Sequence, residues 1–194
     1  MLTGARRLLR PGVALPALAL TLGLGLVPSS AVGSSAAAAA DPIYVKIDGI
    51  PGESKSSKHA NEIEISSFQW GVARPVDSST GLSTGKVKFN PFTITKTIDR
   101  ASPLFFQAAA QGTKLPTVTL TLNRGGASQL DYLTITLTDV LVTSYQLGSG
   151  GDNPAESVSF SFGKIEMSYQ PQKSDGSLDA VVKAGWNVKA NVKA

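Results

Sequence analysis

The stretch that decides the fold is ESVSFSFGKIEMSY, residues 156–169. Apolar side chains occupy every second position in it: Val158, Phe160 and Phe162, then Ile165, Met167 and Tyr169. This alternation is typical of a β-strand with one buried face, because successive side chains point to opposite faces of a sheet. The apolar positions change from even to odd numbers at Gly163-Lys164, and one extra residue in a strand has that effect. We therefore expect a long strand with a β-bulge at Gly163.

The same alternation recurs along the rest of the chain. It covers residues 43–47, 63–72, 87–94, 118–122 and 133–145. Further changes of parity lie near Ser66-Ser67, at Asn90-Pro91 and near Asp139, and the Gly-rich residues 123–126 join two segments as a hairpin. Bulges let strands bend from one sheet into another. Four of them predict a fold dominated by β-structure, a small two-sheet antiparallel β-barrel.

One short helix is expected among these strands, at about residues 103–111. Ser102 is a good N-cap, Pro103 suits the first helical position, and Gly112 suits the left-handed residue that follows a helix. The apolar side of the intervening residues predicts that the helix packs on the barrel.

Residues 1–40 have the layout of a secretory signal peptide. Three arginines precede an apolar run at residues 13–27, and serine and alanine dominate the residues that follow. The alternative is a membrane anchor, but about 20 apolar residues are needed to cross a bilayer, and this run has 15, with Pro16 and two glycines inside it. We expect cleavage near residue 40, by the general or the twin-arginine export route, and a secreted mature protein.

The mature chain, residues 41–194, is predicted to be a single domain, because its length suits one core. The leader holds three arginines and no acidic residue, so its removal lowers the formal net charge from +4 to +1. A nearly neutral domain gives no electrostatic reason to expect a nucleic-acid partner. The chain has no cysteine, which excludes disulfides and thiolate chemistry.

The sequence contains no recognisable catalytic, cofactor-binding or metal-binding motif. The single histidine, His59, lies in a polar loop with Glu53, whereas a metal site or a hydrolase needs several such groups at defined spacing. We expect His59 to make a hydrogen bond that holds the loop. Trp70 continues an apolar alternation and is predicted to be in the core, while Trp186, in the lysine-rich tail, is a tail anchor, a subunit contact or a stacking residue. We predict a protein that is not an enzyme and takes no cofactor or metal.

A series of short motifs runs along the chain in a fixed order. They are Gly52-Glu53-Ser54, Ser67-Phe68-Gln69-Trp70-Gly71, Lys88-Phe89-Asn90-Pro91-Phe92, Asp99-Arg100-Ala101-Ser102-Pro103, Leu115-Pro116-Thr117-Val118, Leu137-Thr138-Asp139-Val140, residues 156–169 and Ala184-Gly185-Trp186-Asn187-Val188-Lys189. In this order they resemble the haemolysin-coregulated protein (Hcp) family, the tube proteins of type VI secretion, over residues 42–193.

The resemblance implies a β-barrel subunit that forms hexameric rings. Stacked rings form the inner tube of an injection machine and carry effectors in the lumen, without catalysis. The loop at residues 51–62 resembles the extended loop that contacts the next ring, and residues 183–193 resemble the common C-terminal segment. The expected ring and subunit contacts are Glu53, Ser54, His59, Trp186 and Lys189. The expected partners are further copies of the chain and an effector or surface partner.

The leader departs from this family pattern, because tube proteins leave through the machine itself and lack an export signal. Either an exported relative has kept the fold, or translation starts downstream of the leader. Two functions remain open: a ring-forming structural protein or carrier, and an exported monomeric β-barrel that binds a glycan, a peptide or a surface partner.

Overall fold

The computed structural model describes residues 41–124, 129–151 and 153–194, which belong to one compact unit. The predicted signal peptide, residues 1–40, lies outside the described residues. Within these ranges no helix is both long and apolar enough to cross a membrane.

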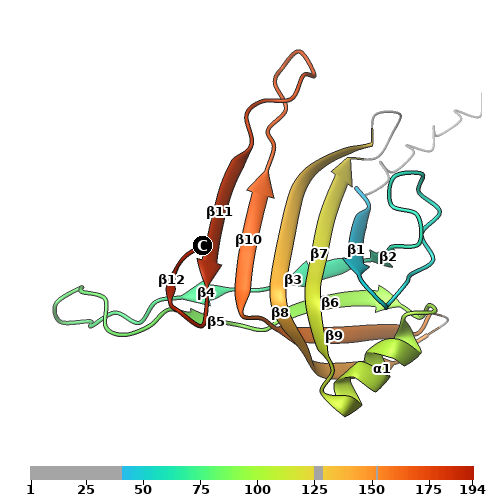
Figure 1. The fold of residues 1–194 in the computed structure, drawn as a ribbon, viewed down its shortest axis with the longest axis horizontal. Helices are drawn as coiled ribbons and strands as arrows, with labels where there is room; N and C mark the ends of the chain where they lie inside the picture. Colours follow the sequence, from blue (N-terminus) through green and yellow to red (C-terminus); the bar gives the residue numbers. More distant parts are fainter. Residues whose placement is uncertain (1–40, 125–128, 152) are drawn as a thin grey trace, which may run out of the picture. The chain divides into compact units, whose positions relative to one another are not determined.

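The described chain forms one helix and a series of antiparallel strands (Figure 1). The helix is α1 (Ser102–Gln111). The strands are β1 (Ile43–Ile47), β2 (Ile63–Ile65), β3 (Ser67–Gln69), β4 (Val72–Ala73), β5 (Lys88–Phe89), β6 (Phe92–Thr97), β7 (Lys114–Arg124), β8 (Leu130–Gly148), β9 (Ala155–Ser161), β10 (Lys164–Tyr169), β11 (Val182–Asn187) and β12 (Val192–Lys193).

The 19-residue strand β8 connects the two halves of the main sheet. Its first part pairs with β7 and β10, and its last part pairs with β9. Between these parts lies Asp139, whose φ of 53° is in the left-handed region, and Figure 1 shows the strand curving from one half into the other. Beyond β7 the sheet continues with β1 and then β2. Beyond β10 it continues with β11 and then β12. Beyond β9 it continues with β6 and then β3. All these pairs are antiparallel.

The mostly antiparallel β-fold with one short helix is confirmed, but the predicted closed two-sheet barrel is not. The strands pair as one ten-stranded sheet that remains open between β2 and β3, and β4 pairs with β5 as a separate two-stranded sheet. Only Ser66 separates β2 from β3, so these strands follow one another and do not pair; β2 pairs with β1, whereas β3 pairs with β6.

Every predicted bulge coincides with an irregularity of the strands. Ser66 separates β2 from β3, residues 90–91 separate β5 from β6, and residues 162–163 separate β9 from β10. At these three places the strand is interrupted. The chain changes its pairing partners at the first two, whereas at the third it stays paired with β8 and exchanges β6 for β11 as its other partner. The positive φ of Asp139 marks the fourth place, inside β8. The parity of the sequence therefore located the bends correctly.

Helix α1 matches its predicted range to within one residue. Its N-cap is Ala101, which makes no side-chain cap hydrogen bond, and Gly112 follows with a φ of 65°. Ser102, the predicted cap, is instead buried, and its hydroxyl donates to the Glu156 carboxylate. Phe105 is fully buried against Phe160, so the helix covers the β9 side of the core.

The alternation that predicted the strands also predicts the core. Val158, Phe160 and Ile165 are almost completely buried. They belong to a cluster with inward side chains of β1, β2, β6, β7 and β8. Met167 is only partly buried, and Tyr169, the last residue of β10, is 41% exposed. Burying these aliphatic and aromatic side chains stabilises the fold by roughly 2 kcal/mol each.

Candidate assembly surfaces

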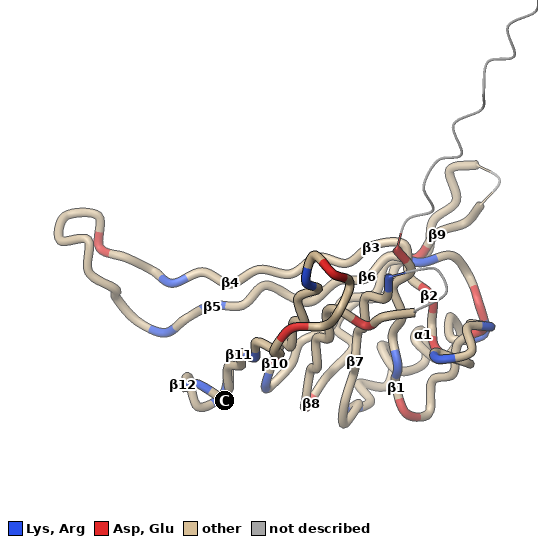
Figure 2. The backbone as a smooth tube through the Cα atoms, turned by 90° about the horizontal axis from the view of Figure 1, so that it is seen from above, with Lys and Arg blue, Asp and Glu red and all other residues tan. Residues whose placement is uncertain are grey.

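A hairpin projects from the folded sheet, and we call it the arm (residues 72–89). Strands β4 and β5 pair at its base, Val72 with Phe89 and Ala73 with Lys88. Figures 1 and 2 both show it extending away from the helix and from β1. About seven residues on each side lie beyond the base, which at about 3.3 Å per residue corresponds to a length of about 23 Å.

Hydrogen bonds order the outer part of the arm. Thr84 N donates to Pro75 O at 2.9 Å, and Asp77 N donates to Leu82 O at 2.9 Å. The Asp77 carboxylate accepts from the backbone N of Ser79 and of Thr80, at 2.8 and 3.1 Å. Hydrogen bonds from Ser79, followed by one from Thr80, lower the pKa of Asp77 below its ordinary value. The tip is therefore a defined turn that does not depend on the core.

The arm exposes cationic and apolar side chains together. Arg74, Lys86 and Lys88 are exposed, and none of them forms an ion pair with another described residue. Val76 and Leu82 are 63% and 68% exposed. Since exposed apolar side chains next to unpaired charges give nothing to the stability of a monomer, the arm has the composition of a contact surface.

The loop at residues 51–62 folds back on its own subunit. Gly52 N donates to Asn61 O at 2.8 Å, and Ser54 N donates to Glu62 O at 3.0 Å. A Cβ atom on Gly52 would lie 2.2 Å from the Glu62 carbonyl oxygen, so only glycine permits this approach. Ser54 is buried. The loop is thus compact. The segments that project from the subunit include the arm and the connection between β10 and β11, residues 170–181 (Figure 1).

His59 fastens this loop to the start of β8. Its Nδ1 lies 2.9 Å from Glu62 Oε2, its Nε2 lies 2.9 Å from Asp131 Oδ1, and its ring stacks on Tyr44 at 4.3 Å. Burial raises the pKa of Asp131, but hydrogen bonds from Lys58, then Asn123 and His59, outweigh burial and hold that pKa below its ordinary value. The predicted role of His59 in holding the loop agrees with this geometry, although its acidic neighbours are Glu62 and Asp131 and not Glu53.

Glu53 lies at the rim of a polar hollow, which we call the β2–β6 depression. Its volume is about 320 Å³, and its lining residues are Glu53, Ser54, Lys55, Glu64, Thr97, Ile98 and Asp99. Glu53 is exposed and accepts from the backbone N of Arg100 at 3.1 Å. Ile98 is 49% exposed. The depression therefore combines carboxylates with an apolar side chain.

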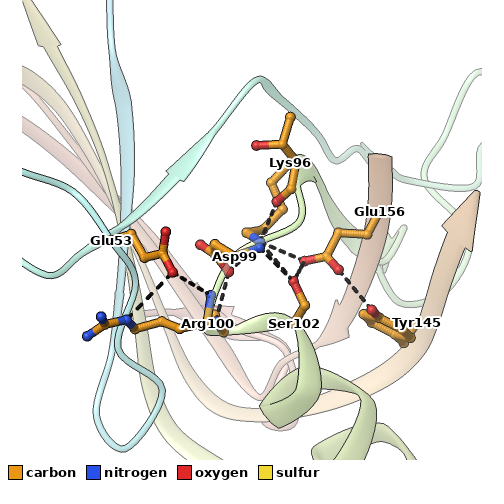
Figure 3. Close-up of polar contacts among 9 residues, drawn as sticks. Glu53, Lys96, Asp99, Arg100, Ser102, Tyr145 and Glu156 are labelled. Atoms are coloured by element: carbon orange, nitrogen blue, oxygen red, sulfur yellow. Dashed lines mark hydrogen bonds and ion pairs between the residues drawn. The ribbon is translucent and has the colours of Figure 1, made fainter. Parts of the chain in front are cut away.

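Next to this depression a group of polar side chains is sealed inside the subunit (Figure 3). Lys96 Nζ donates to Glu156 Oε1, Asp99 Oδ1 and Thr97 O, each at 2.7 Å. Tyr145 OH donates to Glu156 Oε2 at 2.8 Å, and burial, then this hydrogen bond, raises the pKa of Tyr145 to about 12. The side chains of Lys96 and Glu156 are both 0% exposed. The group ties β6, α1, β8 and β9 together and is closed to any substrate.

The C-terminal segment packs on its own sheet. Trp186 in β11 lies opposite Ile165 and lines an apolar groove of about 270 Å³ together with Trp70, Phe89 and Met167. Trp70 is partly buried there and not in the centre of the core. The buried Nε1 of Trp186 has no hydrogen-bond acceptor among the described residues. Lys189 Nζ lies 2.7 Å from Asp139 Oδ2, so the tail is fastened beside the bend of β8.

The structure does not bring the five predicted contact residues together into one surface. Ser54 and His59 are buried, Trp186 lies in the apolar groove, and Glu53 and Lys189 are exposed on different elements. Their role as ring contacts remains a prediction.

Three features escaped the sequence analysis: strands β11 and β12, the arm, and the buried pair of Lys96 and Glu156. The arm has no apolar alternation beyond its base. The buried pair did leave a signal in the sequence. Lys96 follows Phe92 and Ile94 at the inward positions of β6. Its register partner Glu156 precedes Val158 at the inward positions of β9. Opposite charges at core positions of two strands indicate a buried ion pair.

The folded sheet, the sealed polar group and the projecting arm define a mostly antiparallel β-protein with one short helix. Residues 44–169 match the family described as "Type VI secretion system effector, Hcp". The chain is 38% identical to Protein hcp1 of Pseudomonas aeruginosa over 158 residues. The aligned region covers 78% of this chain and 98% of that relative. It is 28% identical to the Major exported protein of the same organism over 138 residues. That aligned region covers 66% of this chain and 80% of the relative.

Solved structures agree with the family match. A type six secretion system protein superposes with a TM-score of 0.74 at 30% identity, covering 80% of this chain and 100% of the other. Hcp1 from Salmonella typhimurium gives a TM-score of 0.66 at 33% identity, covering 79% and 98%. The chain therefore belongs to the Hcp family of type VI secretion proteins.

Proposed function

We propose that the mature chain is a tube subunit that forms hexameric rings, and that the rings stack and carry effectors. The observation that carries this proposal is the match of residues 44–169 to the Hcp family of type VI secretion. The arm supports it, because an ordered hairpin with exposed apolar and cationic side chains needs a neighbouring molecule to cover it. In this proposal the folded sheet acts as the barrel wall of each subunit.

The proposed subunit is a structural component and not an enzyme. The ion pair of Lys96 and Glu156 is closed to solvent, and its hydrogen bonds are satisfied. Such a group stabilises a fold and has no access to a substrate. Removal of the predicted signal peptide would place the subunit outside the cytoplasm, where rings would assemble after export.

The five predicted contact residues take different parts in this proposal. Glu53 and Lys189 are exposed and are available to a neighbouring subunit. Ser54 and His59 are buried, so they act indirectly, by holding the loop at residues 51–62 in place. Trp186 holds β11 on the sheet and borders the apolar groove.

The solution mass of residues 41–194 tests the proposal. We expect light scattering over a tenfold range of concentration to give six times the subunit mass, and electron microscopy to show rings. A monomer at every concentration would overturn it. N-terminal sequencing of the protein from its native source tests the export step: a start near Asp41 supports cleavage, and a formyl-Met start elsewhere contradicts it.

The apolar groove favours a second candidate function, an exported monomeric binding module. Trp70 and Trp186 both border the groove, and an indole ring is suited to stacking against a sugar or an apolar peptide side chain. A monomeric protein whose tryptophan fluorescence changes on binding a glycan or peptide would favour this function. A hexameric protein whose tryptophan fluorescence does not change with any ligand of the same screen would favour the tube subunit.

A further inference from the structure

We propose that the apolar groove between the base of the arm and the β10–β11 pair binds a fatty acid, with the acyl chain in the groove and the carboxylate on Arg74. This site goes beyond the proposed tube and does not depend on it, because one subunit supplies all of its lining residues. The occupant is a free, unbranched carboxylate of about ten carbons, chosen from the volume, the apolar character and the charge of the groove.

Two separate strand pairs of one subunit form the walls of the groove. In Figures 1 and 2 β4 and β5 lie beside β10 and β11, and residues of all four strands line the groove. Trp70 and Phe89 stack with their ring centroids 6.5 Å apart in one wall. In the other wall Trp186 pairs with Ile165, so these two side chains share one face of the sheet. Both walls are therefore apolar, as a hydrocarbon chain requires.

The subunit does not complete this site by itself. Val72, at the edge of the groove, is 54% exposed. The buried Nε1 of Trp186 has no hydrogen-bond acceptor among the described residues, although a buried indole N–H usually has one. Exposed aliphatic surface beside an incompletely satisfied wall indicates that the groove takes an occupant from outside the subunit.

Arg74 gives the groove a cationic end. It lines the groove together with Val72, whereas Ala73 and its register partner Lys88 do not. Arg74 is exposed and forms no ion pair with another described residue; its Nη1 donates to Ser83 Oγ at 3.4 Å, a long hydrogen bond. The described lining residues include no aspartate or glutamate. A guanidinium can donate two parallel hydrogen bonds to one carboxylate, so this end of the groove selects an anionic head group.

The volume of the groove sets the length of the chain. The groove measures about 270 Å³. An apolar cavity of about 150 Å³ holds a six-carbon ring, so this groove holds about ten carbon atoms. Decanoate therefore combines a chain of the right size with the carboxylate that Arg74 would bind.

Titration of the mature chain, residues 41–194, with decanoate tests the site. The sequence has two tryptophans, Trp70 and Trp186, and both line the groove, so tryptophan fluorescence reports on this site. We expect a saturable change of fluorescence. Hexanoate should bind at least about tenfold more weakly, because each buried methylene contributes up to about fourfold in affinity.

Two variants separate the head group from the chain. Arg74→Gln should weaken decanoate binding by about fivefold or more and leave the binding of decanol, which has no charge, unchanged. Ala184→Phe, at an exposed lining position, fills the groove and should abolish the binding of both ligands. Isothermal titration calorimetry gives the affinities, and circular dichroism verifies that each variant is folded.

The matched control is Lys88→Gln. It removes the same charge from the same hairpin, at an exposed residue that does not line the groove. We expect decanoate to bind this variant within about twofold of the wild type, because a separated, exposed charge is largely screened at about 0.1 M salt. An equal loss in Lys88→Gln and Arg74→Gln would overturn the site, since net charge alone would then explain the binding.

The remaining outcomes are equally decisive. No response to decanoate, an equal affinity for hexanoate, or normal binding to the folded Ala184→Phe variant overturns the site. Light scattering of the same samples separates this inference from the proposed function. A hexamer that does not bind decanoate overturns the site and leaves the tube standing, whereas a monomer that binds it overturns the tube and supports the site.

Discussion

At the scale of single residues, the pair Lys96 and Glu156 has the greatest effect on stability. Each is fully buried and pairs with the other; Lys96 also donates to Asp99 and Thr97 O, and Glu156 also accepts from Ser102 and Tyr145. A buried ion pair adds little compared with well-packed apolar residues, but a buried charge without its partner is strongly unfavourable. Substituting one member is therefore more damaging than substituting both.

We predict that Lys96→Met lowers the free energy of unfolding by about 3–5 kcal/mol, because Glu156 then stays buried without a counter-charge. Lys96→Met combined with Glu156→Leu should recover part of this loss. Urea unfolding followed by circular dichroism measures both. A double variant that is less stable than the single variant would contradict the account.

The low pKa of Asp131 predicts a pH dependence. Its folded pKa lies below the unfolded value of 3.8, so its contribution to stability is fully present above pH 3.8 and is lost as the pH falls through the folded pKa. Asp131→Asn should be less stable than the wild type at neutral pH, and the difference should shrink below pH 3.8. Thermal midpoints from neutral to acid pH measure this. A constant difference would refute the role given to Asp131.

At the scale of elements, the compact loop at residues 51–62 depends on its narrow neck. Gly52→Ala would push a Cβ atom into the Glu62 carbonyl oxygen, so the neck must open and expose Ser54 and His59. We predict a loss of about 2 kcal/mol in the free energy of unfolding and faster amide exchange in residues 53–62. Gly150→Ala is the control, because a Cβ atom there meets no other atom within 4 Å. Equal amide exchange of residues 53–62 in both variants would show that the close approach at Gly52 does not hold the loop.

The arm, by contrast, should be removable without unfolding the subunit. Its outer part is exposed and bonds mainly to itself, and β4 and β5 share only two residue pairs. Replacing residues 75–85 by Asn-Gly should change the free energy of unfolding by less than about 0.5 kcal/mol and leave a folded monomer. Light scattering and thermal unfolding provide both values. A hexamer without the arm would show that the ring has another contact.

The sequence predicted most of the elements that face the core but missed β11, and it also missed the arm, which faces solvent. Val158, Phe160 and Ile165 alternate because one face of each strand is buried, and this periodicity is readable in one dimension. The arm has no buried face beyond its base, so no periodicity marks it; its shape comes from the Asp77 turn and cross-hairpin hydrogen bonds. The sequence also could not predict that the sheet stays open between β2 and β3. That opening depends on pairing between strands that are far apart in the sequence.

At the scale of the whole molecule, the proposed ring should respond to salt. The cations of the arm, Arg74, Lys86 and Lys88, are exposed, and the Debye length falls from about 10 Å at 0.1 M to about 3 Å at 1 M salt. We predict that the concentration for half assembly rises severalfold over this range. Light scattering at fixed protein concentration measures the change. Rings that become more stable at high salt would point to a mainly apolar junction.

The continuous strand β8 has a consequence for how the protein would release a load. Because β8 belongs to both halves of the main sheet, neither half can separate from its neighbours while the other keeps its strand pairs. Among the described residues, the strand pairs of β8 therefore oppose a hinge motion between the two halves. Cargo held by a tube of such subunits would leave only through an end of the tube or when the rings come apart, so the timing of release would be set by disassembly.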